Sequence, residues 1–405
     1  MSFRISVSGM NAASQDLNVT SNNIANVNTT GFKQSRAEFG DLFAVSAYGL
    51  SSAATGAGVR MQAVAQQFDQ GNIDFTGRAL DMAISGQGFF TLTNNGATVY
   101  SRAGNFGADR EGYVVNPAGH RLQVFLPNTA GGFDTGRMGD LQLPTGDAPP
   151  AATGNVTVET NLPAAATAPT VTPFDPLDPN SYNHTTAVTV YDSLGAAHSQ
   201  SLYFVKTANP NEWQVHTLVD GNAVGGPQTL QYSDTGALTS PSPGQITLPA
   251  YATTNGSAPL NVVLDLGRST QYGDKFSVLG LTQDGHTTGR LTGVETSPEG
   301  VVSARYTNGV VQPLGQVAMT NFVNPQGLQS LGDNVWAETY NSGEPRRGQA
   351  STADFGMVQG GGLEASNVDL TEQLVNMITA QRNFQANAQM IQTQDQITQT
   401  VINIR

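Results

Sequence analysis

The chain has 405 residues, enough for two or three domains, and a formal net charge of −13. This charge argues against a nucleic-acid-binding protein, which needs Lys and Arg to neutralise phosphates, and it also disfavours binding to an anionic membrane. Only 12% of the residues are charged, about half the usual share of ~25%, and Cys is absent. The absence of Cys excludes disulfides, thiolate metal sites and Cys nucleophiles.

No run of 18 apolar residues occurs, so the sequence predicts no transmembrane helix and no membrane insertion. The first ten residues also lack the apolar core of a cleaved secretory signal. We therefore expect an N-terminus that is not processed by signal cleavage.

The N-terminal segment, residues 1–30, predicts a long helix. Its large apolar residues are seven positions apart, at Phe3, Met10, Leu17 and Ile24. A companion row of small or β-branched residues follows the same spacing: Ser6, Ala13, Thr20 and Val27. Gly31 closes the pattern, as expected for a glycine that ends a helix.

The C-terminal segment, residues 363–405, repeats this design at greater length. Its main row is Leu363, Leu370, Met377, Phe384 and Ile391, and its companion row includes Leu374, Ala388 and Ile402. Ser366 or Asn367 offers an N-cap, and no Gly or Pro interrupts the chain from Asp369 to Ile402. Such a helix is about 50 Å long, so its seven-residue repeat indicates a coiled-coil-like seam with a partner.

Two interpretations of the end helices remain open. They could form an ordinary intramolecular pair, or they could become ordered only when they stack in an assembly. The outward positions carry Asn, Gln, Ser and Thr rather than Lys–Glu pairs, which favours packing against neighbours. The resulting subunit-interface prediction, called the predicted seam below, consists of Phe3, Met10, Leu17, Ile24, Val27, Leu363, Leu370, Leu374, Met377, Phe384, Ile391 and Ile402.

The middle of the chain predicts two β-domains, one nested inside the other. We expect residues 31–70 to be a linker, and residues 71–144 and 285–362 to form a discontinuous β-domain with short strands and Gly- and Asn-rich turns. Eight of the 20 prolines fall between residues 144 and 179, where this domain is interrupted. Residues 145–284 then predict an inserted acidic β-domain. The expected fold is therefore mainly β with long terminal α-helices, a rod-shaped multidomain subunit.

The sequence shows no arrangement typical of a reaction centre. Its five histidines lack the spacing of zinc ligands, and its glycine clusters do not continue as dinucleotide or phosphate-binding motifs. Carboxylate pairs such as Asp175 with Asp178 are expected by coincidence among 31 acids. We therefore expect no catalytic residues, no cofactor and no metal, and a protein that is not an enzyme.

Four separated blocks, in the same order along the chain, resemble the rod and hook proteins of the bacterial flagellum. The first block runs over residues 21–33 (SNNIANVNTTGFK), and the second over 77–90 (GRALDMAISGQGFF). The third is 100–106 (YSRAGNF), and the fourth combines 363–370 (LEASNVDL) with 377–387 (MITAQRNFQAN). The large acidic insert, together with 321–328 (NFVNPQGL) and 332–336 (GDNVW), resembles the hook members more than the shorter distal rod members.

This resemblance implies a structural role. A subunit of this kind polymerises helically into a curved tube, a universal joint that transmits torque from rod to filament. The implied partners are further copies of the chain, the distal rod protein, the hook–filament junction protein, the hook cap protein and the flagellar type III export apparatus. The implied location is extracellular, in the flagellar hook attached to the basal body, after export without a cleaved signal peptide.

Two other functions remain compatible with the sequence. One is a distal rod-type axial subunit, which would form a straight and rigid tube. The other is a secreted carbohydrate-binding β-protein, which requires an apolar-lined pocket with convergent carboxylates and a stable monomer.

Overall fold

A computed structural model describes residues 2–42, 56–128, 131–352 and 354–403. The chain is mainly β, with a helix at each end, and the two helices pack on one another. This confirms the predicted fold class. The chain forms two compact units: unit 1 comprises residues 1–145, 293–304 and 311–405, and unit 2 comprises residues 146–292 and 305–310.

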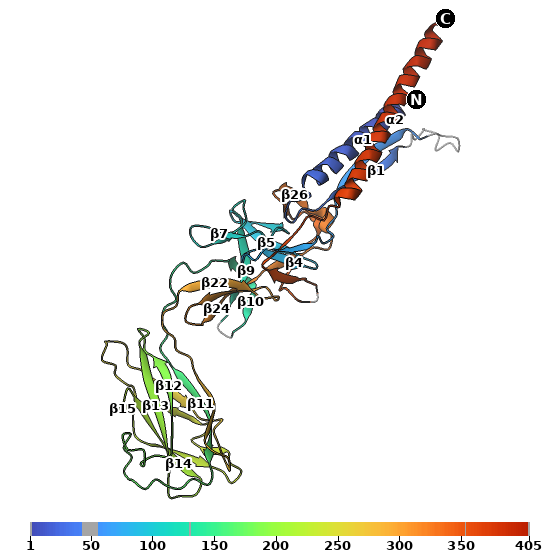
Figure 1. The fold of residues 1–405 in the computed structure, drawn as a ribbon. Helices are drawn as coiled ribbons and strands as arrows, with labels where there is room; N and C mark the ends of the chain where they lie inside the picture. The colour runs from blue at the N-terminus through green and yellow to red at the C-terminus, as the bar shows by residue number, and fades with distance from the viewer. Residues whose placement is uncertain (1, 43–55, 129–130, 353, 404–405) are drawn as a thin grey trace. The chain divides into compact units, whose positions relative to one another are not determined.

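Helix α1 (Ser2–Ala25) and helix α2 (Leu370–Asn403) run antiparallel within unit 1, so that both chain ends lie at the same end of the pair (Figure 1). Helix α1 ends earlier than predicted, because Asn26 donates through its side chain to the Asn22 carbonyl and Asn23 turns to bind the backbone of Ser35. The N-cap of α2 is Asp369 rather than Ser366 or Asn367. Its Oδ1 accepts the backbone N–H of Thr371 at 2.8 Å.

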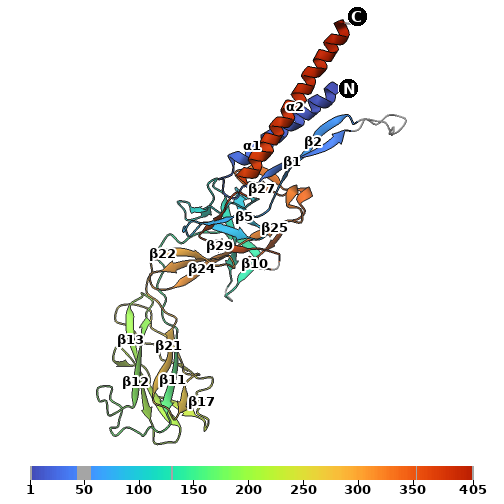
Figure 2. The ribbon, with the colours of Figure 1, turned by 45° about the vertical axis from the view of Figure 1, so that its right-hand side comes forward.

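The segment predicted as a linker, residues 31–70, contains an antiparallel hairpin where the structure describes it. Strand β1 (Ser35–Leu42) pairs along its length with β2 (Gly58–Gln66), with a bulge after Glu38. Figure 2 shows this hairpin alongside the helix pair, and β1 and β2 both contact α1. The described part of this segment is thus not extended chain but a hairpin that packs on α1. Residues 43–55 of the predicted linker lie outside the described residues.

The rest of unit 1 is built on a 13-stranded sheet with the main order β22-β23-β24-β9-β5-β6-β27-β26. Its buried core includes Phe90, Leu92, Leu122, Val124 and Met319, which project from these strands and their neighbours. Apart from the hairpin of β1 and β2, the strands of the unit are two to eight residues long. In chain order they are β3 (Ile73–Phe75), β4 (Met82–Ser85), β5 (Phe89–Asn94), β6 (Ala97–Ser101), β7 (Gly107–Ala108), β8 (Val114–Val115), β9 (Arg121–Pro127), β10 (Phe133–Asp140), β22 (Leu291–Thr296), β23 (Val301–Tyr306), β24 (Val311–Val317), β25 (Met319–Asn321), β26 (Gln329–Gly332), β27 (Val335–Ala337), β28 (Arg346–Gly348), β29 (Met357–Gly360) and β30 (Gly362–Glu364), with 3₁₀ turns at Pro325–Gly327 and Tyr340–Ser342. Strands β22 and β23 each have one end in unit 2.

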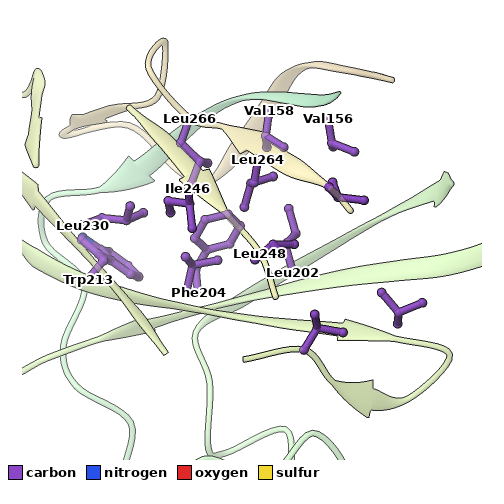
Figure 3. Close-up of a cluster of buried hydrophobic side chains, with 14 of the residues drawn as sticks. Val156, Val158, Leu202, Phe204, Trp213, Leu230, Ile246, Leu248, Leu264 and Leu266 are labelled. Atoms are coloured by element: carbon purple, nitrogen blue, oxygen red, sulfur yellow. The ribbon is translucent and has the colours of Figure 1, made fainter. Parts of the chain in front are cut away.

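Unit 2 is a sandwich of two sheets around its own core. One sheet has the order β18-β19-β11-β20 with β21 on β11, and the other has the order β12-β13-β14-β16-β17 with β15 on β14. Figure 3 shows Val158 and Leu264 of the first sheet facing Leu202, Phe204 and Trp213 of the second. The strands are β11 (Asn155–Pro163), β12 (His184–Tyr191), β13 (Ala197–Lys206), β14 (Glu212–Val219), β15 (Asn222–Ala223), β16 (Gln228–Tyr232), β17 (Leu238–Ser240), β18 (Gln245–Thr247), β19 (Val263–Asp265), β20 (Thr270–Tyr272) and β21 (Ser277–Gln283).

Unit 2 extends further along the chain than the predicted insert 145–284. Ala148 pairs with Gly289 and Ala151 with His286, so the returning chain stays with this unit to Thr292. These isolated bridges lie in Gly-, Ala- and Pro-containing segments that have no strand periodicity, so the sequence gives no sign of them.

Candidate assembly surface

The two helices pack through a row of small and polar residues, called the helix contact row here. Ser6, Ala13 and Thr20 are buried on α1, and Gln373 and Ala380 are buried on α2, each set at seven-residue spacing. A Cβ added at Gly9 would lie 2.5 Å from Oδ1 of Asn387, so the backbone of α1 approaches α2 closely at this level. The close approach uses residues with little apolar surface.

The large apolar side chains of both helices point elsewhere. On α2, Leu374, Val375 and Ile378 are 40%, 58% and 47% exposed. Other exposed apolar residues of the helices are Phe3, Ile5, Leu370, Phe384, Met390, Ile397 and Ile402. Helices that expose this much apolar surface are typical of subunits that are covered in an assembly.

None of the twelve residues of the predicted seam is fully buried in the single chain. Five are exposed: Phe3, Leu370, Leu374, Phe384 and Ile402. Five on the helices are half-buried: Met10, Leu17, Ile24, Met377 and Ile391. The remaining two lie outside the helices, because Val27 follows α1 in a turn and Leu363 belongs to strand β30.

Within the single chain, the two helices do not pair through the main row of α2. On α2 the row that faces α1 contains Gln373 and Ala380, and not the row from Leu370 to Ile391. Ala380 and the small residues of α1 allow the helices to approach closely. The bulky side chains of the row from Leu370 to Ile391 would hold the helices apart. Contacts with a neighbouring subunit are not part of a single chain, so the role of the predicted seam between subunits stays a prediction.

The hairpin beside α1 adds to the uncovered apolar surface. Phe39 and Met61 are cross-strand partners, and each is 39% exposed. Val64, on the same strand as Met61, is 46% exposed. Cross-strand neighbours project from the same face of a sheet, so this face continues the apolar character of the helices.

Amide side chains fix the base of the helix pair to the hairpin. Asn23 forms two bonds with the backbone of Ser35: its Nδ2 donates to the carbonyl at 2.7 Å, and its Oδ1 accepts the N–H at 2.9 Å. The same Nδ2 donates to Oε1 of Gln373 on α2 at 3.1 Å. On the chain leading into α2, Asn367 accepts the backbone N–H of Gln34 at 2.8 Å and donates to the carbonyl of Gln67 at 2.9 Å.

Below these amides lies a buried charge cluster formed by Lys33, Arg102 and Glu364. Lys33 Nζ is 2.6 Å from Glu364 Oε1, and Arg102 Nη1 is 3.3 Å from Glu364 Oε2. The carboxylate also accepts the backbone N–H of Gly71 at 3.0 Å, and Lys33 donates to the carbonyl of Asp69 at 2.8 Å. One carboxylate thus joins the chain after α1, the β-sheet region and the chain before α2.

Burial and charge act in opposite directions within the charge cluster. Burial lowers the pKa of the Lys33 ammonium, and the neighbouring Glu364 carboxylate opposes that change. Burial also lowers the pKa of Arg102, again opposed by Glu364. Because removing one partner would leave a buried charge without compensation, the cluster makes the junction sensitive to any single substitution.

Sequence reasoning did not select these three residues, although each lies in one of the quoted blocks. Lys33 ends the first block, Arg102 lies in the third and Glu364 is the second residue of the fourth. A usable signal was present: Lys33 is one of three lysines in a chain with few charges, and it follows a helix that has only two charged residues. Only the fold shows that the three side chains meet.

Among the described residues, no group of three or more His, Asp or Glu side chains is placed to hold a metal ion. No helix in the described part of the chain is long and apolar enough to cross a membrane.

Comparisons with known proteins agree with the emphasis on both chain ends and both β-units. Residues 3–33 match the model for flagella basal body rod proteins, and residues 359–404 match that for the C-terminal part of the flagellar basal body rod FlgEFG proteins. Residues 83–171 match the D1 domain of flagellar hook protein FlgE/F/G, and residues 161–286 match the flagellar basal body protein FlaE D2 domain.

Full-length relatives decide the assignment. The flagellar hook protein FlgE of Escherichia coli K12 is 41% identical over 414 residues, covering 100% of both chains. The chain belongs to the flagellar hook protein FlgE family. The member from Borreliella burgdorferi is 34% identical, with 98% of each chain covered. The crystal structure of Helicobacter pylori flagellar hook protein FlgE2 shares the fold, with a TM-score of 0.54 over 72% of this chain and 100% of that chain at 16% identity.

Proposed function

We propose that this hook-family chain polymerises helically into the curved tube of the flagellar hook, with its terminal helices forming the inner tube. The observation that carries the proposal is that the helices have two sets of residues, one buried within the chain and one left exposed. The helix contact row is used within the chain, whereas residues such as Leu374, Ile378 and Phe384 keep apolar surface that the described residues leave exposed. Burial of this surface between copies would supply the driving force for assembly.

The proposed roles of the remaining parts follow from the division of the chain. The helix-bearing segments 1–30 and 363–405 form the inner-tube domain. Residues 71–144 with 285–362 form the β-domain around it, and the insert 145–284 forms the outer domain. The segment 31–70 connects the helices to the β-domain through the hairpin and the charge cluster. A torque applied through the tube would be transmitted to the β-domain across this junction.

We further propose the partners and the location that membership of this family suggests. The subunit contacts other copies of itself, the distal rod protein at one end of the tube, and the hook–filament junction protein or hook cap protein at the other. It reaches the outside of the cell through the flagellar type III export apparatus, without a cleaved signal peptide, and acts as a universal joint. It does so as a structural protein and without catalysis.

Identity to hook proteins over the whole chain favours this function over the two alternatives. A distal rod-type subunit is the closer alternative, because residues 3–33 also match a rod-protein model. A secreted carbohydrate-binding β-protein gives no reason for two long helices with uncovered apolar residues.

Polymerisation of the purified chain tests the proposal. In the double variant Leu374→Gln with Ile378→Gln, each change removes a half-exposed apolar side chain from α2. Full burial of such a side chain is worth roughly 1.5–3 kcal/mol, so covering the exposed parts of both contributes about 2 kcal/mol. We expect the critical concentration for assembly, measured by sedimentation, to rise at least about tenfold.

The matched control is Gln385→Asn with Gln392→Asn, which keeps exposed amides on the same helix. It should assemble like the unsubstituted chain, and thermal unfolding should show that both double variants are folded. Electron microscopy of the unsubstituted polymer should show curved tubes. Straight tubes would favour the rod-type subunit, and equal assembly of the Leu374/Ile378 variant would refute the role of the helices.

A further inference from the structure

A histidine in unit 2 lies between two carboxylates. His198, the second residue of β13, has its Nδ1 2.6 Å from Asp220 Oδ2 and its Nε2 3.4 Å from Asp192 Oδ2. Both ring nitrogens thus face acceptors that carry no proton to donate. The arrangement suits an imidazolium, which has a proton on each nitrogen, better than a neutral ring, which has only one.

Each carboxylate also holds a turn in place. Asp192 Oδ1 accepts the backbone N–H groups of Leu194 at 2.9 Å and Ala196 at 2.8 Å, closing the turn between β12 and β13. Asp220 Oδ1 accepts the backbone N–H of Ser199 at 2.9 Å. The Asp192 side chain is completely buried, so its charge depends on these donors and on His198.

The turn that Asp192 closes packs against the chain segments that begin and end unit 2. These segments, 146–153 and 284–290, are called the connector here. Gly195, at φ +82°, is so close to the connector that an added Cβ would lie 2.8 Å from Pro150 Cβ and 3.3 Å from Thr287 Cα. The connector segments pair with each other, since Ala151 donates to the His286 carbonyl at 3.0 Å.

A second contact ties the connector to the same turn. The Thr153 N–H donates to the carbonyl of Tyr191 at 2.8 Å, and the Tyr191 N–H donates back to Thr153 Oγ1 at 2.9 Å. Tyr191 directly precedes Asp192, so any loosening of the Asp192 carboxylate acts on residues that hold the connector.

We propose that protonated His198 is a pH-sensitive clamp that fastens the Asp192–Ala196 turn against the connector, and that loss of its proton loosens the connector of unit 2. The clamp links three turns: Asp192–Ala196, the turn at Asp220, and the loop at Asn255, whose Nδ2 donates to Asp192 Oδ2. Loss of the proton loosens these turns and the connector, whereas the core between the two sheets of unit 2 stays packed.

The direction of the pH dependence follows from the charges. Hydrogen bonding to Asp220 raises the pKa of His198 above its ordinary value of 6.5, with a further contribution from Asp192. A group whose pKa is raised on folding stabilises the fold fully below its unfolded pKa, and this stabilisation is lost as the pH rises through the folded pKa. The pKa values of Asp192 and Asp220 are lowered from 3.8, so their contribution disappears only in acid. The clamp is therefore complete between about pH 4 and 6.5 and opens on the alkaline side.

Other titratable groups near the clamp are engaged elsewhere. Tyr251, beside the loop at Asn255, accepts a hydrogen bond from Asn222. On the connector, Asp284 accepts the N–H groups of Gly154 and Asn155, and His286 lies by Asn308. The charges that act on His198 in the described chain are thus those of Asp192 and Asp220.

The first test is the protonation of the ring itself in the full chain. With ¹⁵N-labelled histidine, and with the His198 signal assigned from the variant His198→Gln, an NMR titration of the unsubstituted chain should show both ring nitrogens of His198 protonated at pH 6, with the proton lost at a higher pH than in an unstructured histidine peptide. A His198 ring that loses its proton at the same pH as the peptide, or at a lower pH, would overturn the proposal.

The second test is hydrogen exchange of the full chain at pH 5.5 and 8.5, corrected for the intrinsic exchange rate with an unstructured peptide. Exchange at Leu194 and Ala196 should rise several-fold at the higher pH. His198→Gln should remove this dependence, whereas His184→Gln should keep it. His184 is a suitable control because it stacks on Phe276 at 4.4 Å and burial lowers its pKa. Equal exchange at both pH values in the unsubstituted chain would refute the clamp.

Discussion

Single residues carry the link between the helices and the β-sheet region of unit 1. Glu364 is the centre of that link, because its carboxylate pairs with both Lys33 and Arg102. Its two oxygens also allow the backbone N–H of Gly71 to join the same cluster. A buried pair of this kind adds little net stability over an apolar pair of the same shape, but it is costly to break from one side.

The variant Glu364→Gln should therefore lower the free energy of unfolding of unit 1 by about 3–5 kcal/mol, because it leaves two buried cations without a counter-charge. The chain has two tryptophans, Trp336 in unit 1 and Trp213 in unit 2, so ¹⁹F NMR of 5-fluorotryptophan can follow each unit during urea unfolding. Only the Trp336 transition should move to lower urea.

An exposed ion pair provides the control. Arg346 Nη1 lies 3.5 Å from Asp354 Oδ2, and the two side chains are 57% and 65% exposed. Asp354→Asn should therefore change the free energy of unfolding of unit 1 by less than about 0.5 kcal/mol. If Glu364→Gln destabilised unit 1 no more than this control, the charge cluster would not be the link described here.

At the scale of elements, the sequence predicted the two helices and the β-character of the middle of the chain, but not how the elements pair. Seven-residue spacing predicted both helices, because this pattern is local. The α1 half of the helix contact row follows the companion row of Ser6, Ala13 and Thr20, but its α2 half was not predictable, since Gln373 and Ala380 carry no strong hydrophobic signal. The charge cluster was also beyond the sequence, because Lys33 and Glu364 are separated by 331 positions and only the assembled fold brings them together.

The unequal lengths of the helices predict a gradient of order along α2. Helix α2 has 34 residues and α1 has 24, so about 15 Å of α2 has no counterpart in α1. Figure 1 shows the C-terminal part of α2 extending beyond the N-terminus of α1. Ile397 and Ile402 in this part are 52% and 66% exposed, which leaves it without the tertiary packing that stabilises most helices.

In hydrogen exchange of the monomer, residues 370–387 should be protected and residues 392–403 should exchange rapidly. Assembly should protect the second range by at least about tenfold, because the exposed isoleucines would then be covered. Protection of residues 392–403 in the monomer would contradict the view that this part of α2 is stabilised by neighbouring subunits.

At the scale of the whole molecule, two hydrophobic cores divide the chain. The core of unit 2 is drawn only from residues of that unit, and it includes the fully buried Trp213 with Phe204, Leu230 and Leu264. Unit 1 has separate clusters, one of which contains Trp336 with Phe89 and Leu328. Because each unit has its own core, each should unfold as its own cooperative unit.

The two tryptophan signals should therefore report two unfolding transitions in urea that do not coincide. The pH-sensitive clamp of unit 2 offers a way to shift the Trp213 transition without the Trp336 transition. Raising the pH from 6 to 8.5 should shift the Trp213 transition to lower urea, because the folded state binds the His198 proton more tightly than the unfolded state does. Over the same range the Trp336 transition should move less, and His198→Gln should abolish the difference between the two responses. A single transition, with both signals changing together at every pH, would mean that the units unfold as one, and that contacts between them outweigh the independence of their cores.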